Sequence, residues 1–323
     1  MTVPSDPAVL IIAYRRQENL QKILKICHAN KIKKIYVSLD GPKNDSHSSL
    51  NDYLSIINIV DFHKNTKDFD VCLLKRPKNR GCAASVLSAI DWVFKFEKSA
   101  IILEDDCIPS DGFFDFSRAS IPVIESSEEI WAACGSQFMP RGLISDEWFL
   151  SRYAIVWGWM TTRTKWALIS RQMRLGKFKY NSNFSIQENV YWKEGASRAF
   201  MGLVDVWDTL FQQQLMSNNK FVIHSNSNLV SNIGNDQFAT HTIDFTRELH
   251  LNLDSYCQPA ELPKQQSIVD EWLRNDFYRI RLRHILSTKV TKFRDRFMGL
   301  SHTRSTLPYR WGLANLDHEN NSM

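Results

Sequence analysis

Four short apolar runs alternate with helical stripes in the first 106 residues, and this alternation constrains the fold more than any other feature. The first run, AVLIIA at residues 8–13, is apolar throughout, as in a strand that is buried on both faces. Three further strand-like runs follow, at residues 33–41, 70–76 and 99–106. Between them, apolar side chains recur at the three- and four-residue spacing of a helix, at residues 19–30, 50–60 and 83–96. The pattern predicts an α/β fold, with a mostly parallel, doubly wound sheet and helices on both faces.

Charged residues gather where the predicted strands end. Arg16 follows the first strand, Asp40 ends the second, and Arg80 comes shortly after the third. The fourth strand ends in three adjacent carboxylates, those of Glu104, Asp105 and Asp106. Ligands of doubly wound sheets bind at the carboxyl ends of the strands, near the point where the strand order reverses. We therefore expect the ligand site at this edge, where the charges suit an anionic ligand with a metal.

The three adjacent carboxylates need a compensating partner. Like charges repel, and each loses solvation when the strand end is covered. A hard cation such as Mg²⁺ or Mn²⁺ takes one or two carboxylates plus phosphate oxygens, which a nucleotide diphosphate supplies. Capping of the following helix is a simpler role for an acid, but Ser110 or Asp111 already offers that cap. The triplet therefore favours a metal–nucleotide site.

The sequence lacks the motifs that characterise several other classes of protein. No G-x-x-x-x-G-K-[ST] or G-x-S-x-G motif occurs, and no G-x-G-x-x-G follows the first strand, which argues against P-loop enzymes, serine hydrolases and dinucleotide dehydrogenases. A net charge of +5 is too weak to indicate nucleic-acid binding. The six cysteines are scattered without a C-x-x-C pair, which predicts reduced thiols. Because neither a signal-peptide pattern nor a bilayer-length apolar run is found, we expect a cytoplasmic protein.

Residues 7–245 resemble the GT-A-fold glycosyltransferases. The likeness is to N-acetylglucosaminyltransferase I and to related, family-2-like bacterial sugar transferases, and it is carried by segments in a shared order: LIIAYRR, VSLDG, AIILEDDCIPSDGFFDF, YAIVWGWM, VDVWD and SNIGNDQFATHT. The resemblance implies the GT-A fold and an inverting, Mn²⁺- or Mg²⁺-dependent transfer of a hexosyl or N-acetylhexosaminyl group. It also implies a nucleotide-diphospho-sugar donor, with UDP expected, and a glycan or lipid-linked glycan acceptor, as in surface polysaccharide biosynthesis.

The resemblance further implies roles for individual residues. Asp106 matches the metal-bridging acid, with Asp105 near the ribose and Glu104 near the donor sugar. The other donor contacts that it implies are Asp40 at the uracil, Arg16 in the nucleotide pocket, Arg80 near the diphosphate and Trp157-Gly158-Trp159 along the sugar. His241 matches the late histidine that many GT-A enzymes place on the metal, although N-acetylglucosaminyltransferase I does not.

The catalytic base stays open between two acids of VDVWD, Asp205 and Asp208. An inverting transferase needs one carboxylate to take the proton of the acceptor hydroxyl. Adjacent acids before a Trp in the eukaryotic relative favour Asp205, whereas the bacterial W-D pattern favours Asp208, which we prefer. Both acids could instead be solvated helix charges. The aromatic side chains of the second half, Trp157 and Tyr191 among them, fit either core packing or a wall of rings that stacks on sugars.

Residues 1–250 form the predicted catalytic domain, with a nucleotide-binding half at 7–135 and an acceptor half at 136–250. Residues 251–323 form a predicted basic helical extension, because residues 271–300 combine apolar side chains at helical spacing with an excess of Lys and Arg. Such a helix can lie on an anionic membrane surface, so we expect peripheral binding at the inner membrane face. Docking of this helix on the catalytic domain is the alternative.

Two other functions compete with the transferase. A sugar-nucleotide synthase shares the fold class but should carry a Gly-rich phosphate loop after the first strand, where this chain reads AYRRQENL. A non-catalytic carbohydrate-binding protein with a decayed site would have lost acids, whereas E-D-D and VDVWD are both intact.

Overall fold

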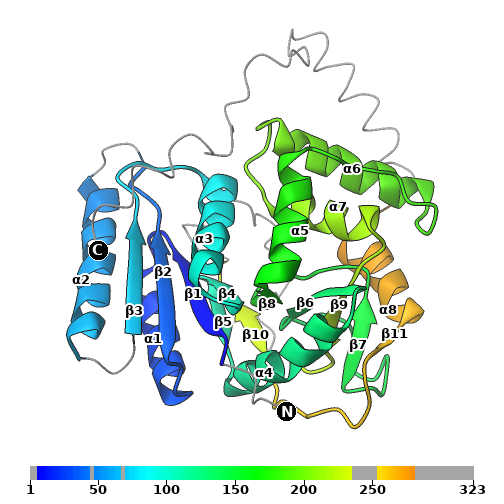
Figure 1. Ribbon diagram of the computed structural model, residues 1–323, viewed down its shortest axis with the longest axis horizontal. Helices are drawn as coiled ribbons and strands as arrows, with labels where there is room; N and C mark the ends of the chain where they lie inside the picture. The colour runs from blue at the N-terminus through cyan, green and yellow to red at the C-terminus, as the bar shows by residue number, and fades with distance from the viewer. Residues whose placement is uncertain (1–5, 44–46, 67–69, 235–252, 281–323) are drawn as a thin grey trace, which may run out of the picture.

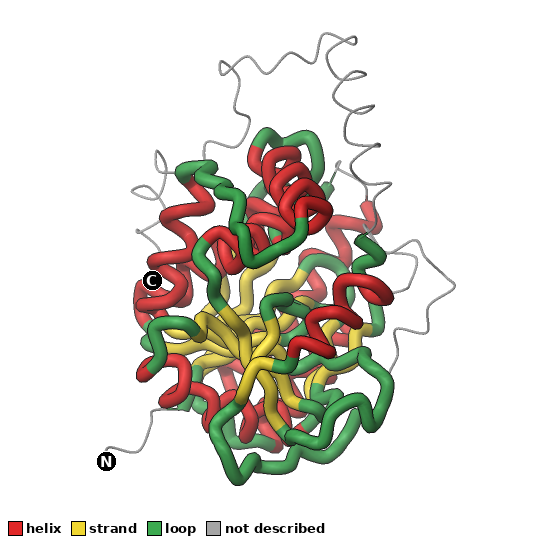
Figure 2. The backbone as a smooth tube through the Cα atoms, turned by 90° about the vertical axis from the view of Figure 1, so that its right-hand side faces the viewer, coloured by secondary structure: helices red, strands yellow, loops and turns green. Residues whose placement is uncertain are grey.

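The computed structural model describes residues 6–43, 47–66, 70–234 and 253–280. Its centre is a nine-stranded sheet that lies between two layers of helices (Figure 1, Figure 2). The strand order is β11-β7-β9-β6-β8-β4-β1-β2-β3. The predicted fold class, an α/β fold with a mostly parallel sheet and helices on both faces, is confirmed.

The first half contains the seven predicted elements in the predicted order: β1 (Ala8–Ala13), α1 (Gln17–Ala29), β2 (Lys34–Leu39), α2 (His47–Thr66), β3 (Asp70–Lys75), α3 (Cys82–Phe96) and β4 (Ser99–Glu104). β1 lies at the centre of this half, because it pairs in parallel with β2 on one side and with β4 on the other. β2 in turn pairs in parallel with β3. The chain thus moves outward from β1 to β3 and then crosses back to β4. The strand order therefore reverses between β1 and β4.

The second half extends the sheet with shorter elements: β5 (Cys107–Pro109), α4 (Asp111–Ser126), β6 (Ile130–Cys134), β7 (Trp148–Ser151), β8 (Trp159–Thr162), α5 (Arg163–Arg174), α6 (Ile186–Phe200), α7 (Asp208–Ser217), β9 (Phe221–Ser225), β10 (Val230–Asn232), β11 (Lys264–Gln265), α8 (Ser267–Trp272) and the π-helical turn η1 (Leu273–Phe277). β8 runs antiparallel between β4 and β6. Its first residue, Trp159, lies opposite Ile102 and Cys134, near the ends of those two strands. β5 and β10 pair in a separate two-stranded ribbon.

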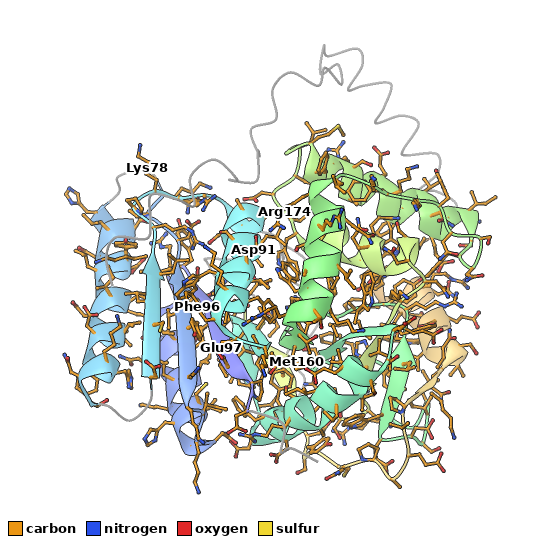
Figure 3. The ribbon with its side chains drawn as sticks, in the orientation of Figure 1. Lys78, Asp91, Phe96, Glu97, Met160 and Arg174 are labelled. Atoms are coloured by element: carbon orange, nitrogen blue, oxygen red, sulfur yellow. The ribbon has the colours of Figure 1, made fainter. Side chains whose placement is uncertain are left out.

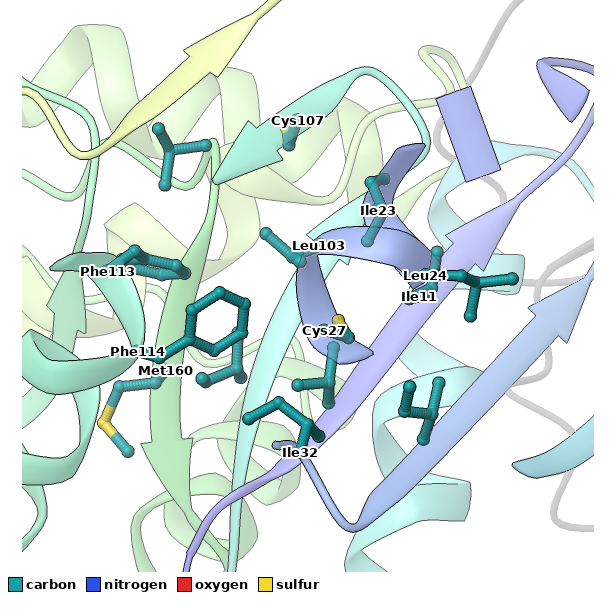
Figure 4. Packing of buried hydrophobic residues seen from close by; sticks show 14 of the residues in the cluster. Ile11, Ile23, Leu24, Cys27, Ile32, Leu103, Cys107, Phe113, Phe114 and Met160 are labelled. Carbon is teal, nitrogen blue, oxygen red and sulfur yellow. The ribbon is translucent and has the colours of Figure 1, made fainter. Parts of the chain in front are cut away.

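Two apolar layers, one on each face of the sheet, hold the helices in place. Both faces of β1 are therefore buried. One layer lies under α1, α2 and α4 and receives Val9, Ile11 and Ala13 (Figure 4). The other lies under α3, α5 and α7 and receives Ala8, Leu10 and Ile12. In that second layer, Asp91 of α3 accepts hydrogen bonds from Trp166 and Arg174 of α5, which ties the two helices together (Figure 3).

The described part of the C-terminal segment, residues 253–280, packs on the same sheet. β11 pairs in parallel with β7 at the sheet edge, and Val269, Leu273 and Ile280 are buried in an apolar cluster there. The apolar side chains of residues 253–280 thus complete a core at this sheet edge, and the domain boundary predicted at residue 250 stays a prediction. Most of the predicted basic helix, residues 281–300, lies outside the described residues. No helix in the described part of the chain is long and apolar enough to span a membrane.

Candidate active site

Three carboxylates at the end of β4 lie where the strand order reverses, and the middle one is held firmly by the protein. Arg16 Nη1 donates a hydrogen bond to Asp105 Oδ1 at 2.8 Å, and the backbone N–H of Tyr14 donates to Oδ2 at 2.9 Å. The side chain of Asp105 is only 6% exposed. Because both of its oxygens have donors, Asp105 fastens the turn after β1 to the end of β4.

Asp106 is the more open neighbour. Its side chain is 20% exposed, and its Oδ2 lies 3.4 Å from Arg16 Nη1. The chain after β10 passes against it, since a Cβ at Gly234 would lie 2.2 Å from Asp106 Oδ2. Burial, together with the charge of Asp105, raises the pKa of Asp106. A positive charge bound at this point would stabilise the ionised carboxylate.

Glu104 is linked to the start of α7. Trp207 Nε1 donates to Glu104 Oε1 at 3.3 Å. Burial, and after it the charge of Asp106, raises the pKa of Glu104 to about 8, and the charge of Asp208 acts in the same direction. The role of Trp207 was missed at the sequence level, although its position between the two acids of VDVWD was a signal. The cluster therefore includes the start of α7 as well as the end of β4.

The residues at this edge fit a cation that takes most of its ligands from a bound phosphate group. Within the described ranges, no group of three or more His, Cys, Asp or Glu side chains is placed to hold a metal ion. Mg²⁺ bound through substrate phosphates needs only one or two protein carboxylates, and Asp106 offers such an oxygen donor. His241, the other predicted metal ligand, lies outside the described residues.

Asp40 lies at the end of β2 and accepts hydrogen bonds from two backbone N–H groups. Gly41 donates to Oδ1 at 2.9 Å, and Arg80 donates to both oxygens at 3.1 Å. Burial raises the pKa of Asp40, against the opposing effect of these N–H groups. Arg80 meets Asp40 through its backbone and is itself exposed, so its predicted place beside a diphosphate stays a prediction.

Arg76 follows the last residue of β3 and is a buried cation near Asp40. It is 3% exposed and donates to Ser38 Oγ at 2.7 Å and to Ser88 Oγ at 2.8 Å. Its charge lowers the pKa of Asp40. Arginine is almost never fully buried without partners. An Arg directly after the apolar run of β3 was therefore a signal in the sequence for a paired cation at the end of this strand.

Asp205 caps the N-terminus of α3. Its Oδ2 accepts the N–H of Cys82 at 2.8 Å, and its Oδ1 accepts the N–H of Ala83 at 2.9 Å. These first N–H groups of a helix have no acceptor within the helix, and a carboxylate there also meets the positive end of the helix dipole. Asp205 therefore joins the loop before α7 to the start of α3.

Asp208 has a different environment. It is the first residue of α7, is exposed, and its Oδ1 accepts the N–H of Thr209 at 2.8 Å. The adjacent Trp207 anchors this helix end to Glu104. The start of α7, with Asp208, is thus joined to the end of β4, and the charge of Asp208 also contributes to the raised pKa of Glu104.

In the segment Trp157-Gly158-Trp159, only one of the two indole rings is exposed to solvent. Trp159 is 0% exposed and packs on Trp207, with ring centroids 5.6 Å apart. This differs from the expectation that Trp159 lines the sugar site, because protein side chains enclose its ring. Trp157 is partly exposed. Gly158 has φ +72°, and a Cβ there would lie 2.6 Å from Val230 Cγ2, so glycine is required between the two rings.

Comparisons with known proteins are distant. No protein-family model matches this chain, and no curated protein shows a significant sequence match. Among solved structures, a UDP-glucose pyrophosphorylase complexed with UDP-glucose is 8% identical, with 68% of this chain and 89% of that chain covered and a TM-score of 0.37. The apo-form glycosyltransferase GlyE of Streptococcus pneumoniae TIGR4 is 17% identical, with 56% and 40% covered and a TM-score of 0.33. Mannose-1-phosphate geranyltransferase from Thermus thermophilus is 10% identical, with 68% and 73% covered and a TM-score of 0.36. Likenesses this low assign no activity to the chain.

Proposed function

We propose that the chain is a metal-dependent, inverting glycosyltransferase. It takes a hexosyl or N-acetylhexosaminyl group from a nucleotide-diphospho-sugar, with UDP as the nucleotide, and transfers it to a hydroxyl of a glycan or lipid-linked glycan. The observation that carries the proposal is the carboxylate cluster at the reversal of strand order, in which Trp207 joins Glu104 to the helix that begins with Asp208. A donor and an acceptor could meet between these two ends.

The donor half of the proposal uses the strand ends. Asp106 would hold Mn²⁺ or Mg²⁺ together with the diphosphate, and the cation would neutralise charge on the leaving group. Asp105 is fixed by Arg16 and by the backbone of Tyr14, which suits a carboxylate that orients a ribose hydroxyl. Asp40, held by backbone N–H groups at the end of β2, would read the base.

The acceptor half of the proposal uses Asp208 as the base. The proton of the acceptor hydroxyl moves to the Asp208 carboxylate, and the oxygen bonds to the anomeric carbon. The bond from that carbon to the diphosphate oxygen breaks, and its electron pair leaves with the nucleoside diphosphate. Asp205 is the less suitable base, because both of its oxygens accept backbone hydrogen bonds from α3. We assign Asp205 a positioning role.

A sugar-nucleotide synthase is the second candidate, since it binds a related nucleotide sugar. The turn after β1 argues against a synthase, which should carry a Gly-rich phosphate-binding loop there. This turn, Tyr14-Arg15-Arg16, has no glycine, and the side chain of Arg16 is bonded to Asp105. A non-catalytic saccharide-binding protein is the third candidate. It gives no account of the carboxylates clustered at the strand ends.

One experiment separates the three candidates. The purified full chain is incubated with Mn²⁺ and UDP-, GDP- or dTDP-sugars, and release of nucleoside diphosphate is followed. A transferase is expected to release nucleoside diphosphate slowly by transfer to water, and to lose that release when the metal is chelated. In a parallel reaction with added pyrophosphate, formation of nucleoside triphosphate from the nucleotide sugar would identify a synthase instead. Thermal stabilisation by a nucleotide sugar without any turnover would identify a binding protein. The proposal would be overturned if no nucleotide sugar were turned over and none raised the melting temperature of the protein.

A further inference from the structure

Five partly exposed aromatic rings form one connected surface that reaches α6, the helix packed on α7, and we propose that they bind the acceptor saccharide. We call this surface the aromatic wall, and it consists of Phe138, Trp157, Tyr191, Phe277 and Tyr278. The inference rests on the proposed function, because it names the second substrate of the same site. It assigns to the C-terminal segment a binding role within the enzyme.

The rings of the wall touch one another across three parts of the chain. Phe138, after β6, lies edge-on to Trp157, with centroids 5.0 Å apart, and stacks on Phe277 at 5.2 Å and 15°. Phe277 also meets Trp157 at 6.4 Å and Tyr278 at 4.8 Å. Side chains that are far apart in the sequence therefore form one apolar surface.

The second end of the wall reaches α6. Tyr278 lies 4.8 Å from Trp192, and Trp192 lies 5.0 Å from Tyr191, in both cases edge to face. The Tyr278 hydroxyl donates to the carbonyl of Ala154 at 3.0 Å, which fixes the ring. The wall thus runs from the loop after β6, through the C-terminal segment, to α6.

At this end of the wall α6 packs on the start of α7, since a Cβ at Gly195, one helical turn after Tyr191, would lie 3.5 Å from Cγ2 of Thr209, the residue after Asp208. Burial raises the pKa of Tyr191 and of Tyr278, and in both cases the charge of Asp208 is the next cause. The carboxylate that we propose as the base therefore lies within electrostatic reach of two rings of the wall. Its charge also reaches Glu104. A molecule resting on the Tyr191 end of the wall would therefore lie near the start of α7, which carries the proposed base.

The backbone that carries Phe277 and Tyr278 is irregular. In η1 the N–H of Tyr278 donates to the carbonyl of Leu273 at 2.8 Å, and the N–H of Ile280 donates to that of Arg274 at 2.9 Å. Arg279 then has φ 51°, a conformation that residues other than glycine rarely adopt. Single π-helical turns and such backbone outliers occur often at functional sites. Here the widened turn accompanies the exposure of two adjacent rings on one surface.

The chemistry of the surface selects a saccharide. A pyranose ring has an apolar C–H face, which can lie on aromatic rings, and hydroxyl groups at its edge. A purely apolar ligand would remove water from the exposed carboxylate of Asp208 and would offer it no hydrogen-bond donor in exchange, which is unfavourable. A sugar covers the rings and at the same time offers a hydroxyl to Asp208. The acceptor class is therefore a glycoside that binds through a C–H face.

The test compares Phe277→Leu with Phe62→Leu, the same substitution at a 64% exposed position on α2. Each full-chain variant is mixed with UDP, Mn²⁺ and methyl glycosides of glucose, galactose, mannose and N-acetylglucosamine, and binding is read by saturation-transfer difference NMR. We expect magnetic saturation to pass from the protein to the ring C–H protons of at least one glycoside in wild type and in Phe62→Leu. In Phe277→Leu this saturation transfer should be weaker. Phe138→Leu provides a second variant of the wall if Phe277→Leu lowers the melting temperature.

A kinetic measurement separates this inference from the proposed function. With an accepted glycoside, Phe277→Leu should raise the KM for the acceptor by about three- to tenfold, the range expected for one lost aromatic contact. The ratio of transfer to donor hydrolysis should fall by a similar factor. If wild type neither binds nor hydrolyses any nucleotide sugar, the proposed function itself fails. If wild type turns over the donor while both wall variants match Phe62→Leu, only the aromatic wall is overturned.

Discussion

At the scale of single residues, Asp205 and Asp208 differ in their partners although they share one short motif. Asp205 accepts two backbone N–H groups of α3, whereas Asp208 begins α7 and is exposed. If Asp208 is the base, Asp208→Asn should lower kcat roughly 10²- to 10⁴-fold and leave donor affinity unchanged, because a base acts only in the transition state. Asp205→Asn should be milder in rate and should lower stability by about 1 kcal/mol, because the amide keeps one acceptor oxygen but loses the second hydrogen bond and the negative charge at the helix N-terminus. Steady-state kinetics and thermal melts distinguish them, and the reverse order of kcat would make Asp205 the base.

Asp106 gives a second prediction at the same scale. Chelation should abolish turnover of wild type, and Mn²⁺ should restore it. Asp106→Asn should stay inactive when Mn²⁺ is added, while its melting temperature stays close to that of wild type, because the side chain is partly exposed and adds little packing. Calorimetric titration of Mn²⁺ in the presence of UDP supplies a readout that is independent of turnover. Near-normal activity of Asp106→Asn under chelation would exclude the metal role.

At the scale of elements, the start of β8 depends on glycine for two reasons that can be separated. Gly158 has φ +72° and a Cβ there would lie 2.6 Å from Val230, whereas Gly142 has φ +79° with open space around it. Gly142→Ala should cost only the left-handed backbone conformation, about 1 kcal/mol. Gly158→Ala should cost about 3 kcal/mol, because overpacking is added. Urea unfolding measures both, and equal losses would mean that Val230 moves aside freely.

His224 in β9 should make stability depend on pH. Its ring is buried against Phe149, and its Nε2 lies 2.9 Å from the carbonyl of Tyr153. Burial lowers its pKa from 6.5 to about 4. The folded pKa is below the unfolded one, so the native state binds fewer protons between these values, and stability is lost as pH falls from about 6.5 to 4. The loss is about 3 kcal/mol. Between pH 7 and pH 4.5, the free energy of urea unfolding should fall less in His224→Gln than in wild type. Equal falls in the two proteins would contradict the assignment of this pH dependence to His224.

The same scale explains how much could be predicted from the sequence. β1 to β4 were predictable because each is a continuous apolar run followed by polar residues, and the burial of both faces of β1 confirms the reason. β8 was not, because a four-residue strand between Gly158 and α5 has no period to detect. Local pattern could not distinguish the enclosed ring of Trp159 from the partly exposed ring of Trp157. The cap formed by Asp205 was hidden because its partners, Cys82 and Ala83, are 123 and 122 residues away.

At the scale of the whole molecule, the C-terminal segment should divide near residue 280 into two parts with different roles. Val269 and Leu273 are 1% and 2% exposed in a core cluster, and Tyr278 is hydrogen-bonded to Ala154. A chain truncated before Val269 should therefore unfold at a lower temperature, because it loses that packing. If the predicted basic helix binds a membrane and does not dock on the catalytic domain, a chain truncated after Ile280 should melt like the full chain. Differential scanning calorimetry of the two truncations tests this division.

The truncation after Ile280 also tests the predicted membrane contact, and it retains the core residues Val269, Leu273 and Ile280. Residues 281–300 combine apolar side chains at helical spacing with an excess of Lys and Arg, and each basic residue near an anionic surface contributes about 1 kcal/mol. We expect the full chain to co-sediment with vesicles that contain phosphatidylglycerol, and to be released as salt screens the charges. The truncated chain should stay in the supernatant, and neither chain should bind vesicles of phosphatidylcholine alone. Equal binding by the full and truncated chains would assign the contact to the catalytic domain, and an absence of binding at low salt would leave an acceptor that reaches the aromatic wall from solution.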